Sequence, residues 1–250
     1  MSTLATKIES GIAHLELHRP EVRNALNLEM VRELHSVLDD LAPREELRAL
    51  VFSGAGGKAF ASGADISELR ERTHREAFLA INGDLFEKIE GFPRPTIAAI
   101  EGYALGGGLE LALACDLRVG AKTAKLGLPE VSLGIYPAAG GTWRLPQLVG
   151  LGRAKELVFT GRIVDGTEAY ALGILERLCD SGQALKTALE LAGLISQNAA
   201  LAVQVAKVSL NAAARGGPPF PVERLGQGLL FDSAEKRQRM TAFLEKRGKK

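Results

Sequence analysis

The sequence predicts a mixed α/β protein in which strands and helices alternate first and helices alone follow. Two compact apolar runs, 47–52 and 96–100, are bounded by glycine or proline and are typical of buried strands. From about residue 166 onward the apolar positions recur at helical spacing, and 175–178 is the single candidate strand there. With 250 residues, 46% of them hydrophobic, the chain can bury a sizeable core.

The first predicted elements are a hairpin and an amphipathic helix. Residues 12–18 alternate between apolar and polar side chains after the turn-forming pair Ser10-Gly11, which predicts a half-buried strand in an opening hairpin. Asn27 suits the N-cap of a helix whose apolar residues recur every three or four positions and which ends near Pro43. The apolar stripe indicates that this helix packs on the rest of the protein.

The last third of the chain is predicted to be helical. The pattern indicates helices at 166–172, 184–197 and 201–214, the first of them closed by Gly173. The run GGPP at 216–219 interrupts the pattern, and a final helix at about 233–246 leads into a basic end. No fixed-period repeat is present in the sequence.

Composition excludes several classes of protein. The 31 Lys and Arg residues balance 30 Asp and Glu residues, so no overall field favours nucleic acid or an anionic membrane. Cys115 and Cys179 are isolated in sequence, which fits a reducing compartment, and neither a signal peptide nor a membrane-spanning apolar run is recognisable. We therefore expect a cytoplasmic protein. The four histidines lack metal-ligand spacing, so we expect no metal.

Two glycine-rich segments do not fit nucleotide-binding motifs. In the segment 54–58, Phe52 stands where a phosphate-binding loop needs its first glycine, and Ala59 stands where it needs Ser or Thr. The segment 106–108 lacks the last glycine of the dinucleotide-binding fingerprint. Both segments therefore argue against a nucleotide enzyme.

The second of these segments has the features of an oxyanion-binding site. Glycines 106–108 allow close approach of a ligand and precede an apolar helix at 109–114, whose first N–H groups and dipole would stabilise a developing negative charge. Glu110 lies about one helical turn after Gly107, and burying its carboxylate in this apolar stretch is costly. The alternative is a carboxylate that only complements the helix dipole.

Three long segments resemble the signatures of the crotonase (enoyl-CoA hydratase/isomerase) family. They are KAFASGADISEL at 58–69, AAIEGYALGGGLELALACD at 98–116 and LPEVSLGIYPAAGGTWRLP at 128–146. Their order and spacing are similar to those of the family, and weaker similarity covers nearly the whole chain. The resemblance implies a spiral of ββα units at 1–195 with the acyl-CoA site. It further implies a helical region at 196–250 that forms a trimer or a dimer of trimers.

The resemblance implies an enoyl-CoA hydratase, which adds water reversibly to a 2-enoyl-CoA and gives a 3-hydroxyacyl-CoA, as in fatty acid β-oxidation. The thioester oxygen is expected to accept hydrogen bonds from the backbone N–H groups of Ala64 and Gly107. Glu110 is expected to orient and deprotonate the water, and Glu130 to supply the proton to C2. No cofactor beyond the CoA of the substrate is expected.

The family also suggests positions that contact CoA or the acyl group. They are Arg23, Ala25, Leu26, Ala61, Ser62, Gly63, Asp65, Ile66, Gly106 and Tyr136. The segment 73–82 falls where the family varies around the acyl pocket, and Tyr136, bulkier than usual, suggests a shortened pocket. The usual tail is truncated after 247, so no tail lysine is assigned to CoA.

Three alternatives remain open from the sequence. A double-bond isomerase often retains only one of the two acids, whereas this chain has both Glu110 and Glu130. An RNA-binding relative predicts a lysine-rich helix, whereas 184–197 contains Lys186 as its single basic residue. A scaffold without activity has no use for both acids.

Overall fold

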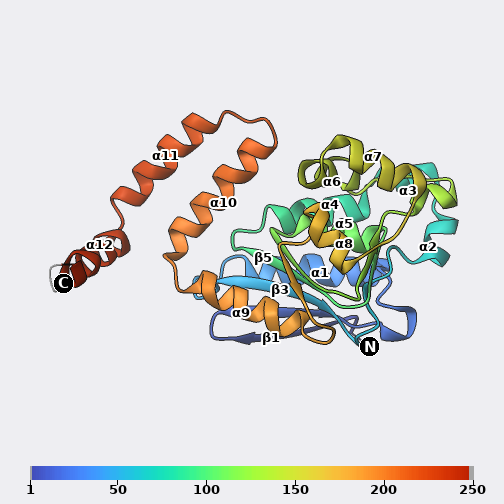
Figure 1. Ribbon diagram of the computed structural model, residues 1–250, viewed down its shortest axis with the longest axis horizontal. Helices are drawn as coiled ribbons and strands as arrows, with labels where there is room; N and C mark the ends of the chain where they lie inside the picture. The colour runs from blue at the N-terminus through green and yellow to red at the C-terminus, as the bar shows by residue number, and fades with distance from the viewer. Residues whose placement is uncertain (1, 248–250) are drawn as a thin grey trace. The chain divides into compact units, whose positions relative to one another are not determined.

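The computed structural model describes residues 2–247, which form two compact units that meet between Gly193 and Leu194. In the first unit the strands form two sheets, and the strands between residues 49 and 127 alternate between these sheets (Figure 1). Within the described residues, the larger sheet has six strands in the order β1 (Leu4–Glu9), β2 (Ile12–Leu17), β3 (Ala49–Gly54), β5 (Thr96–Ile100), β7 (Leu117–Ala121) and β10 (Arg177–Cys179). The smaller has four strands in the order β4 (Ala59–Ala61), β6 (Tyr103–Leu105), β8 (Lys125–Gly127) and β9 (Val164–Asp165).

This alternation makes a spiral of ββα turns. Strands β3, β5 and β7 enter the larger sheet, and the strand that follows each of them, β4, β6 or β8, enters the smaller one. Pairing along β2-β3-β5-β7-β10 and along β4-β6-β8 is parallel, whereas β1 and β9 are antiparallel to their neighbours. The carboxyl ends of β4, β6 and β8 therefore meet at one edge of the smaller sheet.

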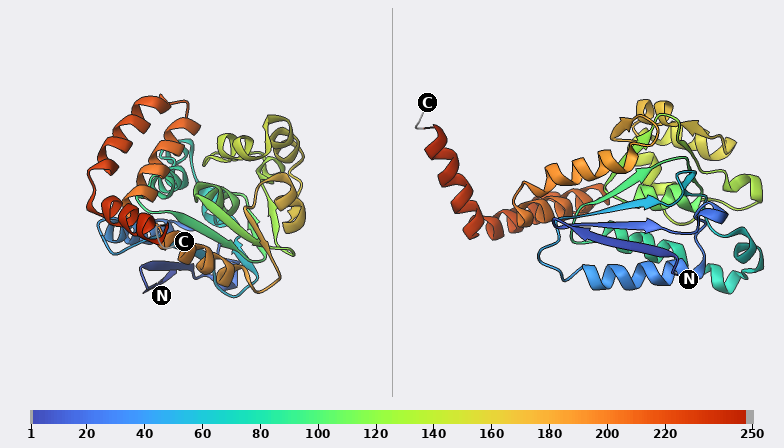
Figure 2. Two further views of the ribbon diagram at one scale, coloured as in Figure 1. Left: turned by 60° about the vertical axis from the view of Figure 1, so that its left-hand side comes forward. Right: turned by 90° about the horizontal axis from the view of Figure 1, so that it is seen from below.

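Helices cover both faces of the larger sheet. α1 (Leu28–Leu41) begins where the Asn27 side chain accepts a hydrogen bond from the Met30 N–H at 3.0 Å, and its apolar stripe is buried. Figure 2 shows α1 and the start of α9 (Ala184–Ser196) on opposite sides of this sheet. The other helices of the first unit are η1 (Pro20–Val22), α2 (Ile66–Glu71), α3 (His74–Ala77), α4 (Ile81–Glu90), α5 (Gly107–Ala114), η2 (Glu130–Leu133), α6 (Gly141–Val149), α7 (Leu151–Thr160) and α8 (Gly166–Leu172).

The predicted elements agree with the structure in most places and shift in a few. The hairpin, α1, β5, α8 and the start of α9 lie where the sequence predicts them, and the candidate strand at 175–178 lies at Arg177–Cys179. The three-residue strands β4, β6 and β8 were not predicted, because they are too short to show a periodicity.

The second unit consists of helices. After the end of α9 it contains α10 (Ala200–Ala214), α11 (Pro219–Phe231) and α12 (Ala234–Arg247), and α10 packs against α11. The sequence predicts no helix at 219–231 because Pro219 and Pro221 read as breakers. Both lie in the first turn, where a helix leaves its N–H groups unbonded. Between residues 2 and 247, no single helix is long and apolar enough to cross a membrane.

Candidate active site

Three predicted site residues follow three neighbouring parallel strands. Ala64 comes after β4, Gly107 after β6 and Glu130 after β8. Ligands of parallel sheets bind outside the carboxyl ends of the strands, which is where these three residues lie. Sequence segments more than sixty positions apart are therefore brought to one edge of the smaller sheet.

The N–H groups of Ala64 and Gly107 lie side by side. A methyl group placed on the Gly107 Cα would be 3.4 Å from the Ala64 nitrogen, and one placed on the Gly63 Cα would be 3.6 Å from the Gly107 nitrogen. Gly63 has a φ of +108°, a conformation that other residues rarely adopt, and this turns the chain before Ala64.

Both N–H groups are free to bind a ligand. The bridge between Leu26 and Ala64 uses the Gly63 carbonyl and the Asp65 N–H, so it leaves the Ala64 N–H unbonded. Gly107 is the first residue of α5, whose first N–H groups have no partner within the helix. In the described part of the chain neither N–H donates a hydrogen bond. The pair can stabilise an oxygen that becomes negative.

Glu110 projects from the first turn of α5 and is 3% exposed. Its Oε1 accepts hydrogen bonds from the N–H groups of Ala139, at 2.8 Å, and Gly141, at 2.9 Å. Burial raises the pKa of Glu110, against the opposing effect of these two hydrogen bonds and of the charge on Arg144. Oε2 accepts no hydrogen bond from residues 2–247, so it can hold a water or a proton.

Arg144 fixes the loop that orients Glu110. This buried guanidinium donates from Nη1 to the Ala139 carbonyl at 3.0 Å and forms ion pairs with Glu90 at 2.6 Å and Glu87 at 3.2 Å. Arg144 thereby ties α4 and α6 to the loop whose N–H groups hold the Glu110 carboxyl. Arg144 was not predicted from the sequence, because its burial depends on α4, which is remote in sequence.

Glu130 is the first residue of η2, and its side chain lies beside Gly106. Its Oε1 is 3.1 Å from the position that a methyl group on Gly106 would occupy. Both carboxyl oxygens are buried and have no hydrogen-bond partner among the described residues. Burial raises the pKa of Glu130 to about 7, and the charge of Glu110 contributes in the same direction.

The two acids therefore differ in environment while lying close enough to interact. Glu110 receives two N–H donors that stabilise a carboxylate, whereas Glu130 receives none and is readily protonated near neutral pH. Such a pair can act as a base and an acid in the same reaction. Glu110 lies three residues after Gly107 on α5, and Glu130 lies beside Gly106.

The segments proposed to bind CoA lie together. The Ser62 N–H donates to the Arg23 carbonyl at 3.1 Å, and the Leu26 N–H donates to the Gly63 carbonyl at 2.8 Å. Arg23 is exposed, with its Cζ 5.4 Å from the centre of the Tyr103 ring. The positions Ala61, Gly63 and Gly106 are buried, whereas Ile66 and Tyr136 are exposed.

Some of these positions can offer only backbone to a ligand. The Ala25 and Leu26 side chains are buried, so any contact from them uses main-chain atoms. The Asp65 carboxylate accepts from Ser67 at the N-cap of α2 and pairs with Arg19 at 3.1 Å. The role of Asp65 in the described structure is therefore to hold the loop.

The sequence analysis also named no role for Asn82, whose side chain amide lies near Gly107. Asn82 lies in the segment 73–82, where the family varies, and no sequence pattern distinguishes this residue from its neighbours. Among residues 2–247, no three His, Cys, Asp or Glu side chains gather in a way that could hold a metal ion.

The chain is similar to known proteins along almost its whole length. Residues 7–250 match the enoyl-CoA hydratase/isomerase family. The chain is 38% identical to the short-chain-enoyl-CoA hydratase of Clostridium acetobutylicum over 248 residues, covering 96% of this chain and 93% of that protein. It is 37% identical to the crotonyl-CoA hydratase of Syntrophomonas wolfei, covering 96% and 94%.

Solved structures show the same fold. The enoyl-CoA hydratase of Bacillus anthracis superposes with a TM-score of 0.93 at 34% identity, covering 98% of this chain and 96% of that one. DspI of Pseudomonas aeruginosa superposes with a TM-score of 0.93 at 35% identity, covering 98% and 95%. The ββα spiral, the paired N–H groups and the match along almost the entire sequence lead to one conclusion: the chain belongs to the enoyl-CoA hydratase/isomerase, or crotonase, family.

Proposed function

We propose that this chain is an enoyl-CoA hydratase, which adds water across the double bond of a 2-enoyl-CoA thioester and gives a 3-hydroxyacyl-CoA. The observation that carries the proposal is the convergence of two free N–H groups, from Ala64 and Gly107, with two buried acids of different environment. The hydratase names of relatives at 37–38% identity support it.

The geometry suggests how the reaction proceeds. The thioester oxygen accepts both N–H groups, and these stabilise the negative charge that reaches it when water attacks C3. Each such donor typically lowers a barrier by about 3 kcal/mol. Glu110, held by two N–H groups, takes a proton from the water through its unbonded Oε2. Glu130, with its raised pKa, gives a proton to C2.

Two acids favour hydration over double-bond isomerisation. Moving a double bond needs one group that removes a proton and returns it elsewhere on the chain. Adding water needs one group on the water and another at C2. Both Glu110 and Glu130 are buried at this site, which suits the second reaction.

The test uses crotonyl-CoA. We expect loss of the conjugated-thioester absorbance and a product heavier by one water. Glu110→Gln and Glu130→Gln should each lower kcat by at least about 100-fold, while Glu190→Gln, an exposed control on α9, should not. An inactive wild type that instead converts 3-enoyl-CoA would replace hydratase by isomerase.

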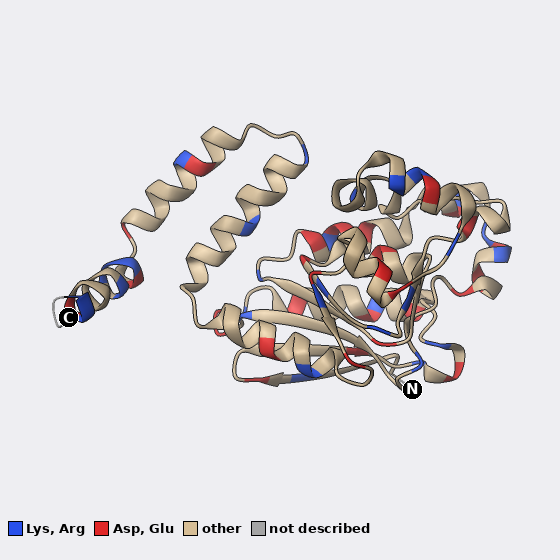
Figure 3. Cartoon of the chain, viewed as in Figure 1, with Lys and Arg blue, Asp and Glu red and all other residues tan. Residues whose placement is uncertain are grey.

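The proposal includes a homo-oligomer, either a trimer or a dimer of trimers. The second unit exposes many large apolar side chains, and α10 and α11 carry few charges (Figure 3). These side chains are Val208, Leu210, Phe220, Leu225, Leu229, Phe231, Met240, Phe243 and Leu244. Exposed apolar surface of this kind is typical of an interface between subunits.

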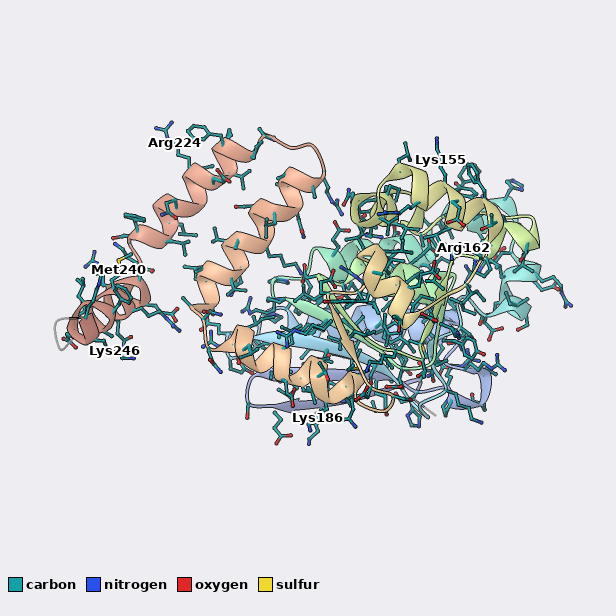
Figure 4. The ribbon with its side chains drawn as sticks, in the orientation of Figure 1. Lys155, Arg162, Lys186, Arg224, Met240 and Lys246 are labelled. Carbon is teal, nitrogen blue, oxygen red and sulfur yellow. The ribbon has the colours of Figure 1, made fainter. Side chains whose placement is uncertain are left out.

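We also propose a cytoplasmic location and no nucleic-acid partner. Neither Cys115 nor Cys179 forms a disulfide within residues 2–247, which suits a reducing compartment. Lys186 remains the single basic residue of α9, and Figure 4 labels it on that helix. A salt-dependent shift of RNA at modest protein concentration would contradict the second part of this proposal.

A further inference from the structure

Asn82 carries a polar side chain that the fold itself does not use. It is the second residue of α4, and its Oδ1 is buried without a hydrogen-bond partner. Within residues 2–247, the other buried side-chain polar atoms without a partner are the two carboxyl oxygens of Glu130. Among the described side chains, unpaired buried polar atoms are therefore confined to Asn82 and Glu130, which lie near Gly107 and Gly106.

The other end of the Asn82 amide faces the paired N–H groups. A methyl group on the Gly107 Cα would be 3.6 Å from Asn82 Nδ2 and 3.4 Å from the Ala64 nitrogen. Nδ2 makes no hydrogen bond to the described residues and, unlike Oδ1, is not fully buried. The Ala64 N–H and the Asn82 amide thus flank the same position beside Gly107, whose own backbone N–H is the third donor.

The backbone before Asn82 is strained. Ala80 precedes α4 with a φ of +46°, in the left-handed region that alanine seldom adopts. Ala80 is the N-cap of α4, two residues before Asn82. Strain of this kind is concentrated at functional sites.

The stability of the fold does not explain an asparagine at position 82. An unpaired buried oxygen destabilises a protein, and asparagine is a weaker helix former than leucine. The N-cap of α4 is Ala80, so Asn82 does not cap the helix. An apolar side chain of similar size would fill the same space without these costs.

We propose that Asn82 Nδ2 is a third hydrogen-bond donor to the thioester carbonyl oxygen, beside the N–H groups of Ala64 and Gly107. The inference rests on the proposed function, because it assumes that the thioester oxygen binds this pair. In it, Asn82 adds to the stabilisation of the negative charge and fixes the plane of the thioester.

The experiment compares wild type with Asn82→Leu and Asn82→Asp. Leucine removes the donor and the unpaired oxygen together, and aspartate keeps the shape while replacing the donor with an acceptor. Asp84→Asn, at an exposed position of α4, is the matched control. Three quantities are measured: Tm, kcat with crotonyl-CoA, and the infrared carbonyl stretch of bound [1-¹³C]butanoyl-CoA, which cannot be hydrated.

We expect Asn82→Leu to keep or raise Tm and to lower kcat by about 10- to 100-fold. The kcat of Asn82→Asp should be lower than that of Asn82→Leu. In both variants the carbonyl stretch should move back toward its value in water, because the carbonyl is less polarised. The control should match wild type in all three measurements.

The outcomes separate this inference from the proposed function. If wild type does not hydrate crotonyl-CoA, the proposed function fails whatever the variants do. If wild type is active and both variants keep its kcat and carbonyl stretch, the role of Asn82 is overturned. Should Asn82→Leu fold poorly, Asn82→Asp decides: an unchanged carbonyl stretch overturns the role and a shifted one supports it.

Discussion

Glu130 determines how the rate should depend on pH. An acid whose pKa is raised to about 7 keeps its proton below that pH and loses it above. In the proposed mechanism this proton goes to C2, so kcat/KM for crotonyl-CoA should fall as the pH rises through about 7. At lower pH it should fall again when the Glu110 carboxylate is protonated.

A pH–rate series in both directions measures this. Water addition releases no net proton, so dehydration of 3-hydroxybutanoyl-CoA should give the same bell-shaped profile, because the active form carries one proton shared between the two acids. A rate that stays constant across about one pH unit on either side of the pKa of Glu130 would contradict the assigned role.

Individual site residues differ in how far the sequence could identify them. Gly107 and Glu110 follow from local reasoning, because a glycine run before an apolar helix and an acid one turn later are visible in the sequence. Glu130 and Ala64 are indicated only by the family motifs. Asn82 and Arg144 were not identified, because the burial and contacts of both depend on segments remote in sequence.

At the scale of the element, α5 has two adjacent glycines with different tasks. A methyl group on Gly108 would be 2.1 Å from the Ala61 carbonyl oxygen, an impossible contact. A methyl group on Gly107 would touch the Ala64 nitrogen at 3.4 Å, an ordinary contact, but in the proposed site it would crowd the thioester oxygen that accepts from both N–H groups. We therefore expect that Gly107 must lack a side chain to leave room for the ligand, and that Gly108 must lack one to pack against β4.

We therefore expect opposite outcomes from two neighbouring substitutions. Gly107→Ala should keep Tm close to that of wild type and lower kcat/KM by at least about 100-fold, because the methyl group displaces the substrate oxygen. Gly108→Ala should lower Tm sharply, because α5 must move away from β4. Thermal melting and crotonyl-CoA kinetics on both variants check this, and a stable, fully active Gly107→Ala would refute the assignment.

Elements were predictable where their pattern was long. α1 shows four apolar residues at helical spacing after a capping asparagine, and β5 is a bounded apolar run. α11 was missed because the run GGPP at 216–219 reads as a break in the helical pattern, whereas in the structure α11 begins at Pro219 and packs against α10. Strands of three residues carry too few side chains to reveal a period.

At the scale of the whole molecule, the division of strands between two sheets could not be predicted from residue patterns. Buried strands of the two sheets have similar compositions. No local pattern indicates that β3 joins the larger sheet and β4 the smaller one. The family motifs supplied this information, and the matching structures show the same fold. The boundary between Gly193 and Leu194 likewise depends on contacts, since no linker composition marks it.

The second unit provides a test of association. Leu225→Glu places a charge on an exposed apolar position of α11, so it should shift the protein toward monomers, because a buried unpaired charge destabilises an interface. Gln227→Glu, which adds the same charge at an exposed polar position of α11, should leave the assembly intact. Sedimentation velocity at several concentrations distinguishes the two, and an unchanged sedimentation coefficient for Leu225→Glu would argue against this interface.

The site residues also come from successive turns of the ββα spiral, and different turns contribute different functions. In the proposed site, the loops after β4 and β6 bind the thioester oxygen, whereas the loop after β8 supplies Glu130. Exchanging that third loop alone could redirect the proton, or replace water by another nucleophile, while the first two turns continued to bind the same class of thioester. An architecture of this kind allows reaction type to diversify without rebuilding substrate capture.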